Sequence, residues 1–182
     1  LEKIDENAFQ LAVDTILSAK HIYIIGIRSC APLASFLSFY FTLMFDNVHL
    51  LQTSSSSEIF EQMVRIGKED VIIGISFPRY SMRTLKAMEF ANNRSAKVIT
   101  LTDSVHSPMN LYSSCNLIAE SDMASIVDSL VAPLSVINAL IVALCMRKQG
   151  EVAKTLEMLE DIWDEYQVYE NDEINYIDDS IK

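Results

Sequence analysis

Five short apolar segments, separated by longer segments with helical spacing, restrict the fold of this chain more than any other feature. The short segments are residues 21–27, 48–52, 71–76, 97–102 and 115–119. They are rich in β-branched residues and hardly alternate between polar and apolar positions, which is typical of strands covered on both faces. Such strands pair in parallel, and right-handed crossovers place the connecting helices on both faces. The sequence therefore predicts a three-layer, doubly wound α/β/α sandwich with a five-stranded parallel sheet.

The remaining segments predict helices and a single domain over residues 1–182. The apolar spacing predicts helices at 2–19, 33–45, 57–66, 81–93, 128–148 and 151–166. Those at 2–19 and 151–166 flank the sheet unit, and Gly150 is expected to cap the helix before it. Residues 103–112 read as a loop or a short helical turn. Residues 171–182 are acidic, and we expect them to be a frayed end.

Composition limits the partners of the chain. The 182 residues carry a formal net charge of −11, so their long-range field repels polyanions and we expect this chain itself not to bind DNA. Its first residue is not Met and already belongs to a helical pattern, which favours a piece of a longer protein. Cys30, Cys115 and Cys145 have no metal-ligand spacing to the histidines, so we expect no metal, no cofactor and reduced thiols in a cytoplasmic protein.

Two very apolar helical segments bear on the membrane and on assembly. Residues 130–146 are interrupted by Pro133, Ser135 and Asn138 and fall short of the roughly 20 apolar residues that a bilayer span needs. We therefore expect a buried helix and no membrane partner. Because this segment and residues 33–45 are apolar on more sides than one sheet face covers, we also predict a homodimer or a higher homo-oligomer.

A strand–loop–helix junction at residues 70–84 carries the clearest binding signal. The strand stops at Ser76, a turn contains Pro78, and a helical pattern begins at Ser81. At such a junction the free N–H groups and the positive dipole end of the helix attract anions. The two serine hydroxyls and the planar guanidinium of Arg79 suit a phosphate. The alternative is an ordinary turn in which Ser81 is an N-cap and Arg79 lies in solvent.

Several loops taken together resemble the sugar isomerase (SIS) domain. The resemblance rests on residues 26–30 (GIRSC), Ser57 with Glu58, residues 76–81 (SFPRYS) and residues 98–102 (VITLT), and it spans roughly residues 14–147. Within that family the chain looks most like the effector domain of RpiR-type bacterial transcription regulators. The resemblance implies binding of a phosphorylated sugar without turnover. It also implies that DNA is contacted only through a separate N-terminal helix-turn-helix domain, which this chain lacks.

The chain departs from the family pattern at two places. The family loop after the third strand resembles Ser-x-Ser-Gly-x-Thr, and here Pro78 and Arg79 replace the inner serine and the glycine. Pro78 removes a backbone donor, and Arg79 either restores the attraction for an anion or faces a subunit interface. In the first loop Arg28 stands where many members have glycine, so this loop is less free to wrap a phosphate.

Three functions remain open from the sequence. The leading hypothesis is a sensor in which Ser29, Ser76 and Ser81, with Arg79 and Arg28, hold a sugar phosphate, and Glu58 is the sixth predicted ligand-binding residue. The runner-up is an aldose–ketose isomerase, because Ser57-Glu58 resembles the position of the catalytic base in sugar isomerases. Glu58 is otherwise a helix N-terminal residue favoured by the dipole, and the loop residue His106 is its weak candidate acid partner. The third hypothesis is a purely structural dimerisation domain with a vestigial pocket.

Overall fold

A parallel five-stranded sheet forms the centre of the protein in the computed structural model, which describes residues 5–52, 55–120 and 129–169. The strands are β1 (Ile22–Gly26), β2 (Val48–Leu50), β3 (Val71–Ile75), β4 (Lys97–Thr102) and β5 (Cys115–Ile118). The helices are α1 (Glu6–Leu17), α2 (Ala31–Thr42), α3 (Ser56–Gln62), α4 (Met82–Asn93), α5 (Val131–Arg147) and α6 (Gln149–Glu165). Two 3-10 turns, η1 (Arg28–Cys30) and η2 (Pro108–Leu111), follow β1 and β4.

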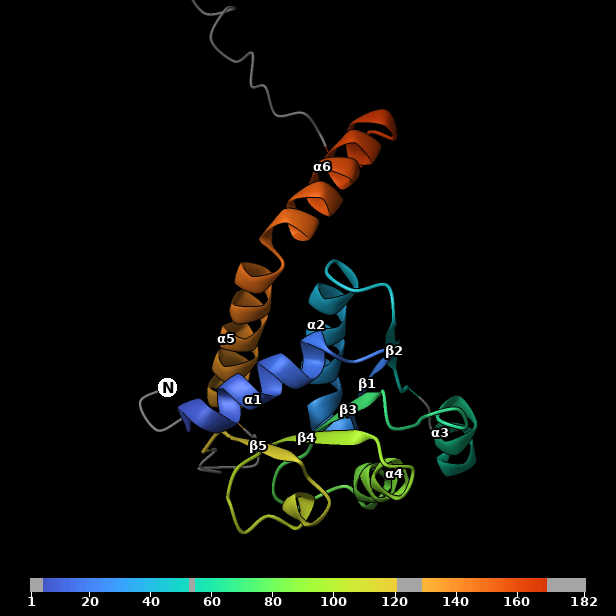
Figure 1. Ribbon diagram of the computed structural model, residues 1–182, viewed down its shortest axis with the longest axis vertical. Coiled ribbons are helices and arrows are strands. Elements are labelled where there is room, and N and C mark those ends of the chain that lie inside the picture. The colour runs from blue at the N-terminus through green and yellow to red at the C-terminus, as the bar shows by residue number, and fades with distance from the viewer. Residues whose placement is uncertain (1–4, 53–54, 121–128, 170–182) are drawn as a thin grey trace, which may run out of the picture.

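The strand order is β2-β1-β3-β4-β5, and every pair is parallel. Helices α1, α2 and α5 share one hydrophobic cluster with the sheet, while α3 and α4 share the other, so the sheet is covered on both faces (Figure 1). The predicted three-layer, doubly wound architecture is confirmed. The strand order reverses between β1 and β3, and ligands of such folds bind beyond the carboxyl ends of the strands at this point.

The absence of alternation in the strands follows from this double coverage. In β1, Ile22 and Ile24 belong to the cluster under α2, while Tyr23 and Ile25 belong to the cluster under α3 and α4. All five residues of β1 are buried. Burying an isoleucine side chain stabilises the fold by about 1.5–3 kcal/mol, which favours apolar side chains on both faces of β1.

Gly26, the last residue of β1, allows the first loop to pass close to the sheet. A Cβ atom at this position would lie 2.6 Å from the backbone oxygen of Cys30 and 2.9 Å from the Cβ of Ala34. Only a residue without a side chain therefore fits between β1, η1 and the first turn of α2. This packing fixes where η1 begins.

The ends of several elements differ from the sequence prediction. Gly150 does not cap the long helix: α5 ends at Arg147, and Gly150 lies in the first turn of α6. The chain bends by 98° between the two helices, with Lys148 between them. The helix predicted at 57–66 ends earlier, at Gln62, because the backbone then closes a tight turn in which the N–H of Ile66 donates to Met63. The predicted acidic tail at 171–182 lies outside the described residues.

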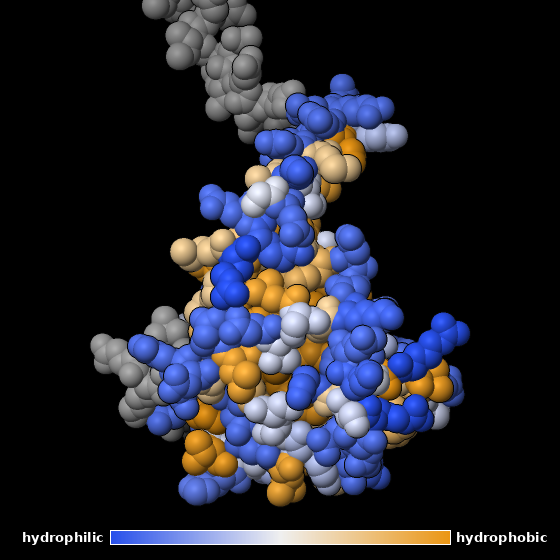
Figure 2. Space-filling view, viewed as in Figure 1, coloured by the Kyte–Doolittle hydropathy of each residue, from blue (hydrophilic) through white to orange (hydrophobic). Residues whose placement is uncertain are grey.

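Helix α6 projects from the body of the protein (Figure 1). None of its residues is buried. Leu156 and Ile162 are 41% and 45% exposed, and Tyr166, directly after the helix, is 71% exposed. Figure 2 shows apolar side chains among hydrophilic ones on this helix. Across the described parts of the chain, no single helix has both the length and the apolar character that crossing a membrane requires.

Candidate functional site: an anion pocket at the carboxyl edge of the sheet

Two loops meet above the strand pair β1 and β3. The ends of these strands are paired in register, Gly26 with Ile75, so η1 and the loop from Ser76 to Ser81 leave the sheet side by side. Between them is a cavity of about 220 Å³. Five of the six predicted site residues line it: Arg28, Ser29, Ser76, Arg79 and Ser81.

Both arginines of the pocket adopt the left-handed backbone conformation. The φ angle is 60° at Arg28 and 63° at Arg79. This conformation costs an L-residue about 1–2 kcal/mol and is the one that glycine adopts freely. Each loop therefore has the backbone conformation that a glycine would adopt, and it also carries a guanidinium that glycine lacks. Such strain persists where the surrounding structure imposes it, which occurs often at ligand-binding sites.

Ser76 and Ser81 are tied together at the start of α4. The backbone N–H of Ser81 donates to Ser76 Oγ at 3.0 Å, and Ser76 is only 3% exposed. Ser81 is the N-cap of α4, since its Oγ accepts from the N–H of Thr84 at 3.4 Å. Each oxygen accepts a backbone donor, so each hydroxyl proton remains able to donate to an anion. The N-cap interpretation of Ser81 is thus confirmed, and the role of Ser81 in ligand binding stays a prediction.

Tyr80 anchors the loop to the neighbouring strand. Its hydroxyl donates to Asp103 Oδ1 at 2.8 Å, and Thr102 Oγ1 at the end of β4 donates to the same oxygen at 3.2 Å. Burial and the hydrogen bond to Asp103 raise the pKa of Tyr80, so the phenol stays protonated and keeps this bond. The contact anchors the residue next to Arg79, whose own side chain is exposed at the cavity. The sequence prediction missed Asp103; its place directly after the apolar strand β4, next to β3, was the signal for it.

Glu58 and His106 are placed differently from the other predicted residues. Glu58 is exposed in the first turn of α3 and is not among the residues that line the 220 Å³ cavity. His106 is exposed in the loop after β4, where its backbone N–H donates to Ser104 Oγ at 3.2 Å, and it does not line the cavity either. The structure therefore does not place either Glu58 or His106, the candidate base and its candidate acid partner, in the lining of the anion pocket.

Comparisons with known proteins agree with this architecture. The family model of the SIS domain matches residues 15–143. The sugar isomerase domain of an RpiR transcription factor from Sphaerobacter thermophilus has a TM-score of 0.83 at 24% identity, with 88% of this chain and 89% of that one covered. The Vibrio vulnificus NanR protein complexed with ManNAc-6P has a TM-score of 0.78 at 16% identity, and the match covers 93% of this chain.

Three further findings extend the comparison. This chain spans 64% of the length of the NanR chain. A Methanococcus jannaschii protein with an inferred function of 3-hexulose-6-phosphate isomerase has a TM-score of 0.66 at 15% identity, with 82% of this chain and 84% of that chain covered. Comparison with curated protein sequences gives no significant match. Because the family model covers well over half of the sequence, this chain belongs to the SIS domain family.

Proposed function

We propose that the chain is the sugar-phosphate-binding effector domain of an RpiR-type transcription regulator whose DNA-binding domain lies outside this sequence. The observation that carries the proposal is Arg79, which places a guanidinium at a glycine-like backbone position between Ser76 and Ser81. Two arginines, three serines and a helix N-terminus at one cavity suit a phosphate. A regulator of this kind binds both a metabolite and DNA, so we place the protein in the cytoplasm as part of this proposal.

The size of the cavity indicates which part of the ligand it takes. At about 220 Å³ it is smaller than the roughly 300–1,000 Å³ of pockets that enclose a whole small molecule. It therefore suits the phosphate end of a phosphorylated sugar, while the sugar extends beyond the two loops. Among the solved structures, the NanR protein is complexed with ManNAc-6P, which is a sugar phosphate of this kind.

Calorimetry with hexose and amino-sugar phosphates, each compared with its unphosphorylated sugar, tests the proposal. We expect binding of phosphorylated sugars only. Replacing Ser76 or Ser81 with Ala should each weaken binding by about 1–3 kcal/mol, because a donor to a charged group is lost. Ser135→Ala is the matched control, since this hydroxyl lies on α5 and donates to the backbone of Val131. Equal binding of free sugars would refute the proposal.

The isomerase hypothesis makes a different prediction. Moving a proton between sugar carbons needs a base within about 3 Å of that proton and usually a second group that protonates the oxygen. Glu58 is the candidate base, but its weak candidate partner, His106, is exposed in the loop after β4. We therefore expect no exchange at the carbons beside the carbonyl when the protein is incubated with fructose 6-phosphate or arabinose 5-phosphate in deuterated water. Exchange above a protein-free control that disappears in Glu58→Gln would make the chain an isomerase and Glu58 its base.

We further propose that the protein is at least a dimer. Helices α2 and α5 pack against each other, yet Phe39 and Tyr40 on α2 remain 60% and 36% exposed. Val142 and Met146 on α5 are 57% and 74% exposed. A second copy covering these side chains would remove them from water. Light scattering at micromolar concentration should give at least twice the mass of 20.5 kDa; a clean monomer would contradict the proposal.

A further inference from the structure

A second pocket lies at the opposite edge of the sheet from the anion pocket. It has a volume of about 700 Å³ and is lined by residues just before β1 and β3, by His49 of β2 and by the end of α3 with the turn after it. The anion pocket lies where β1 and β3 end, so the two sites occupy the two ends of the same strand pair. The volume falls within the range of pockets that bind small molecules.

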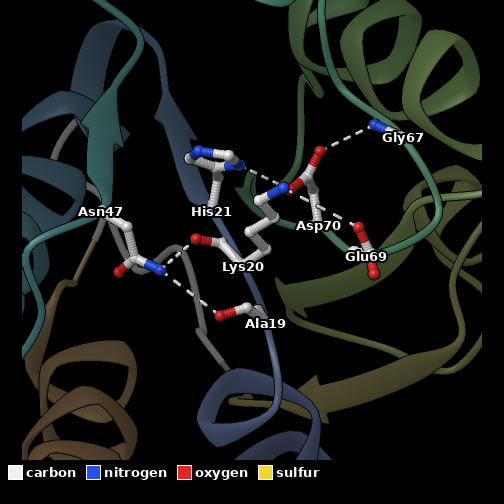
Figure 3. Close-up of polar contacts among 7 residues, drawn as sticks. All are labelled: Ala19, Lys20, His21, Asn47, Gly67, Glu69 and Asp70. Atoms are coloured by element: carbon white, nitrogen blue, oxygen red, sulfur yellow. Dashed lines mark hydrogen bonds and ion pairs between the residues drawn. The ribbon is translucent and has the colours of Figure 1, made fainter.

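A buried carboxylate organises this second pocket. Asp70, whose side chain is 7% exposed, accepts the N–H of Gly67 at 2.8 Å and contacts His21 Nδ1 at 2.8 Å (Figure 3). A carboxylate only accepts hydrogen bonds, so it holds the proton on Nδ1 of His21. Both oxygens of the Asp70 carboxylate are thus engaged in hydrogen bonds within the protein. His21 keeps its second nitrogen, Nε2, and its side chain is 40% exposed.

A second imidazole lies next to the first. His49 stacks on Tyr23 with ring centroids 4.9 Å apart, and its centroid is 5.6 Å from that of His21. Burial and the nearby His21 lower the pKa of His49, while Asp70 acts in the opposite direction. Burial and the charge of Asp70 raise the pKa of Tyr23, and the charge of Arg65 opposes this shift in part. These five groups therefore form one electrostatic cluster.

The charge of the pocket depends on the two imidazoles. Arg65, Lys68 and Lys20 line it together with Glu61, Glu69 and Asp70, so their formal charges cancel while the histidines are neutral. Two of the carboxylates are engaged, Asp70 with His21 and Glu69 with Lys20 at 4.0 Å. Each imidazole that takes up a proton adds one positive charge beside Arg65 and Lys68. The pocket then carries a net positive charge in a chain whose net charge is −11.

We propose that this pocket is a second anion site, which binds a small oxyanion of the phosphate or sulfate type when His21 and His49 are protonated. An anion interacts favourably with two neighbouring imidazolium groups that otherwise repel each other. Because the anion binds the protonated imidazoles more tightly, its binding must favour their protonation by the same free energy. The site is independent of the sugar-phosphate function proposed above.

Sulfate is a suitable probe because it stays a dianion over the pH range in which histidine titrates. We would follow the ring signals of the three histidines of the chain by NMR during sulfate titrations at about pH 5.5 and about pH 7.5. The signals of His21 and His49 should shift saturably at the lower pH, with an affinity at least about tenfold higher than at the upper pH. The exposed loop residue His106 serves as the internal control.

Variants assign the response to this pocket. Arg65→Gln should lower the sulfate affinity at about pH 5.5 by about tenfold, the equivalent of one lost bond to a charged group. Lys154→Gln, on the projecting helix α6, is the control for a general loss of positive charge. Arg79→Gly removes a cation of the anion pocket at the other edge, so a response that survives it belongs to the second pocket.

Comparison of inorganic phosphate with glycerol phosphate then distinguishes a site for the free anion from one for a phosphate ester. The proposal is overturned if the shifts of His21 and His49 do not exceed that of His106. It is equally overturned if sulfate binds as tightly at about pH 7.5 as at about pH 5.5, or if Arg65→Gln binds sulfate like the unmodified protein.

Discussion

Replacing Arg79 with glycine is expected to weaken sugar-phosphate binding by about 10- to 100-fold without changing the free energy of unfolding by more than about 1 kcal/mol. The loss of binding follows from the loss of a charged donor, which contributes about 1.5–3 kcal/mol. Stability is preserved because Arg79 has a φ of 63°, which glycine adopts without strain. The relief of strain offsets the larger conformational entropy of glycine in the unfolded chain.

This variant separates the charge of Arg79 from its backbone conformation. Calorimetry measures the affinity, and urea denaturation measures the free energy of unfolding. Lys86→Ala is the matched control, because Lys86 is an exposed cation on α4 that does not line the cavity. If Arg79→Gly bound sugar phosphates as tightly as the unmodified protein, Arg79 would have to act elsewhere, for example at a subunit interface.

Gly26→Ala is expected to lower the free energy of unfolding by about 3 kcal/mol and to abolish much of the ligand binding. The added methyl group would lie 2.6 Å from the backbone oxygen of Cys30 and 2.9 Å from Ala34, and neither atom belongs to a flexible side chain. Overpacking of this kind typically costs about 1–3 kcal/mol. Any relaxation must move η1, which carries Arg28 and Ser29 into the pocket.

Gly150→Ala provides the comparison for this effect. A Cβ at Gly150 would meet nothing within 4 Å, and the residue lies inside α6. Alanine favours the helix by up to about 1 kcal/mol over glycine, so this variant should unfold at an equal or slightly higher urea concentration. Equal stability of Gly26→Ala and Gly150→Ala would show that the first loop does not depend on the close contact at Gly26.

The architecture could be predicted from the sequence because it rests on a local signal that tertiary packing reinforces. A run such as residues 71–75 is apolar at every position, as a strand buried on both faces requires. The prediction that Gly150 ends the long helix was wrong. Glycine is common just after a helix, but it is also found inside helices, so its position alone does not fix a helix end. Here the bend lies at Lys148, and Gly150 begins the next helix instead.

The site could be predicted only in part. The motif indicated Ser76, Arg79 and Ser81 because hydroxyls and a cation followed a strand directly, and the structure places all three at one cavity. The left-handed conformation of Arg79 could not be predicted, since arginine has no preference for it. The second pocket could not be found from spacing either, because His21, His49 and Asp70 are brought together by the sheet rather than by the sequence.

A crystal structure of the chain with the sugar phosphate that binds most tightly in calorimetry is the most direct test of the anion pocket. We expect the phosphate to lie between η1 and the loop from Ser76 to Ser81. There it should accept hydrogen bonds from the guanidinium of Arg79 and the hydroxyl of Ser76, with the sugar extending out of the 220 Å³ cavity. A sugar phosphate bound elsewhere, with this cavity unchanged, would contradict the proposal that the cavity is the effector site.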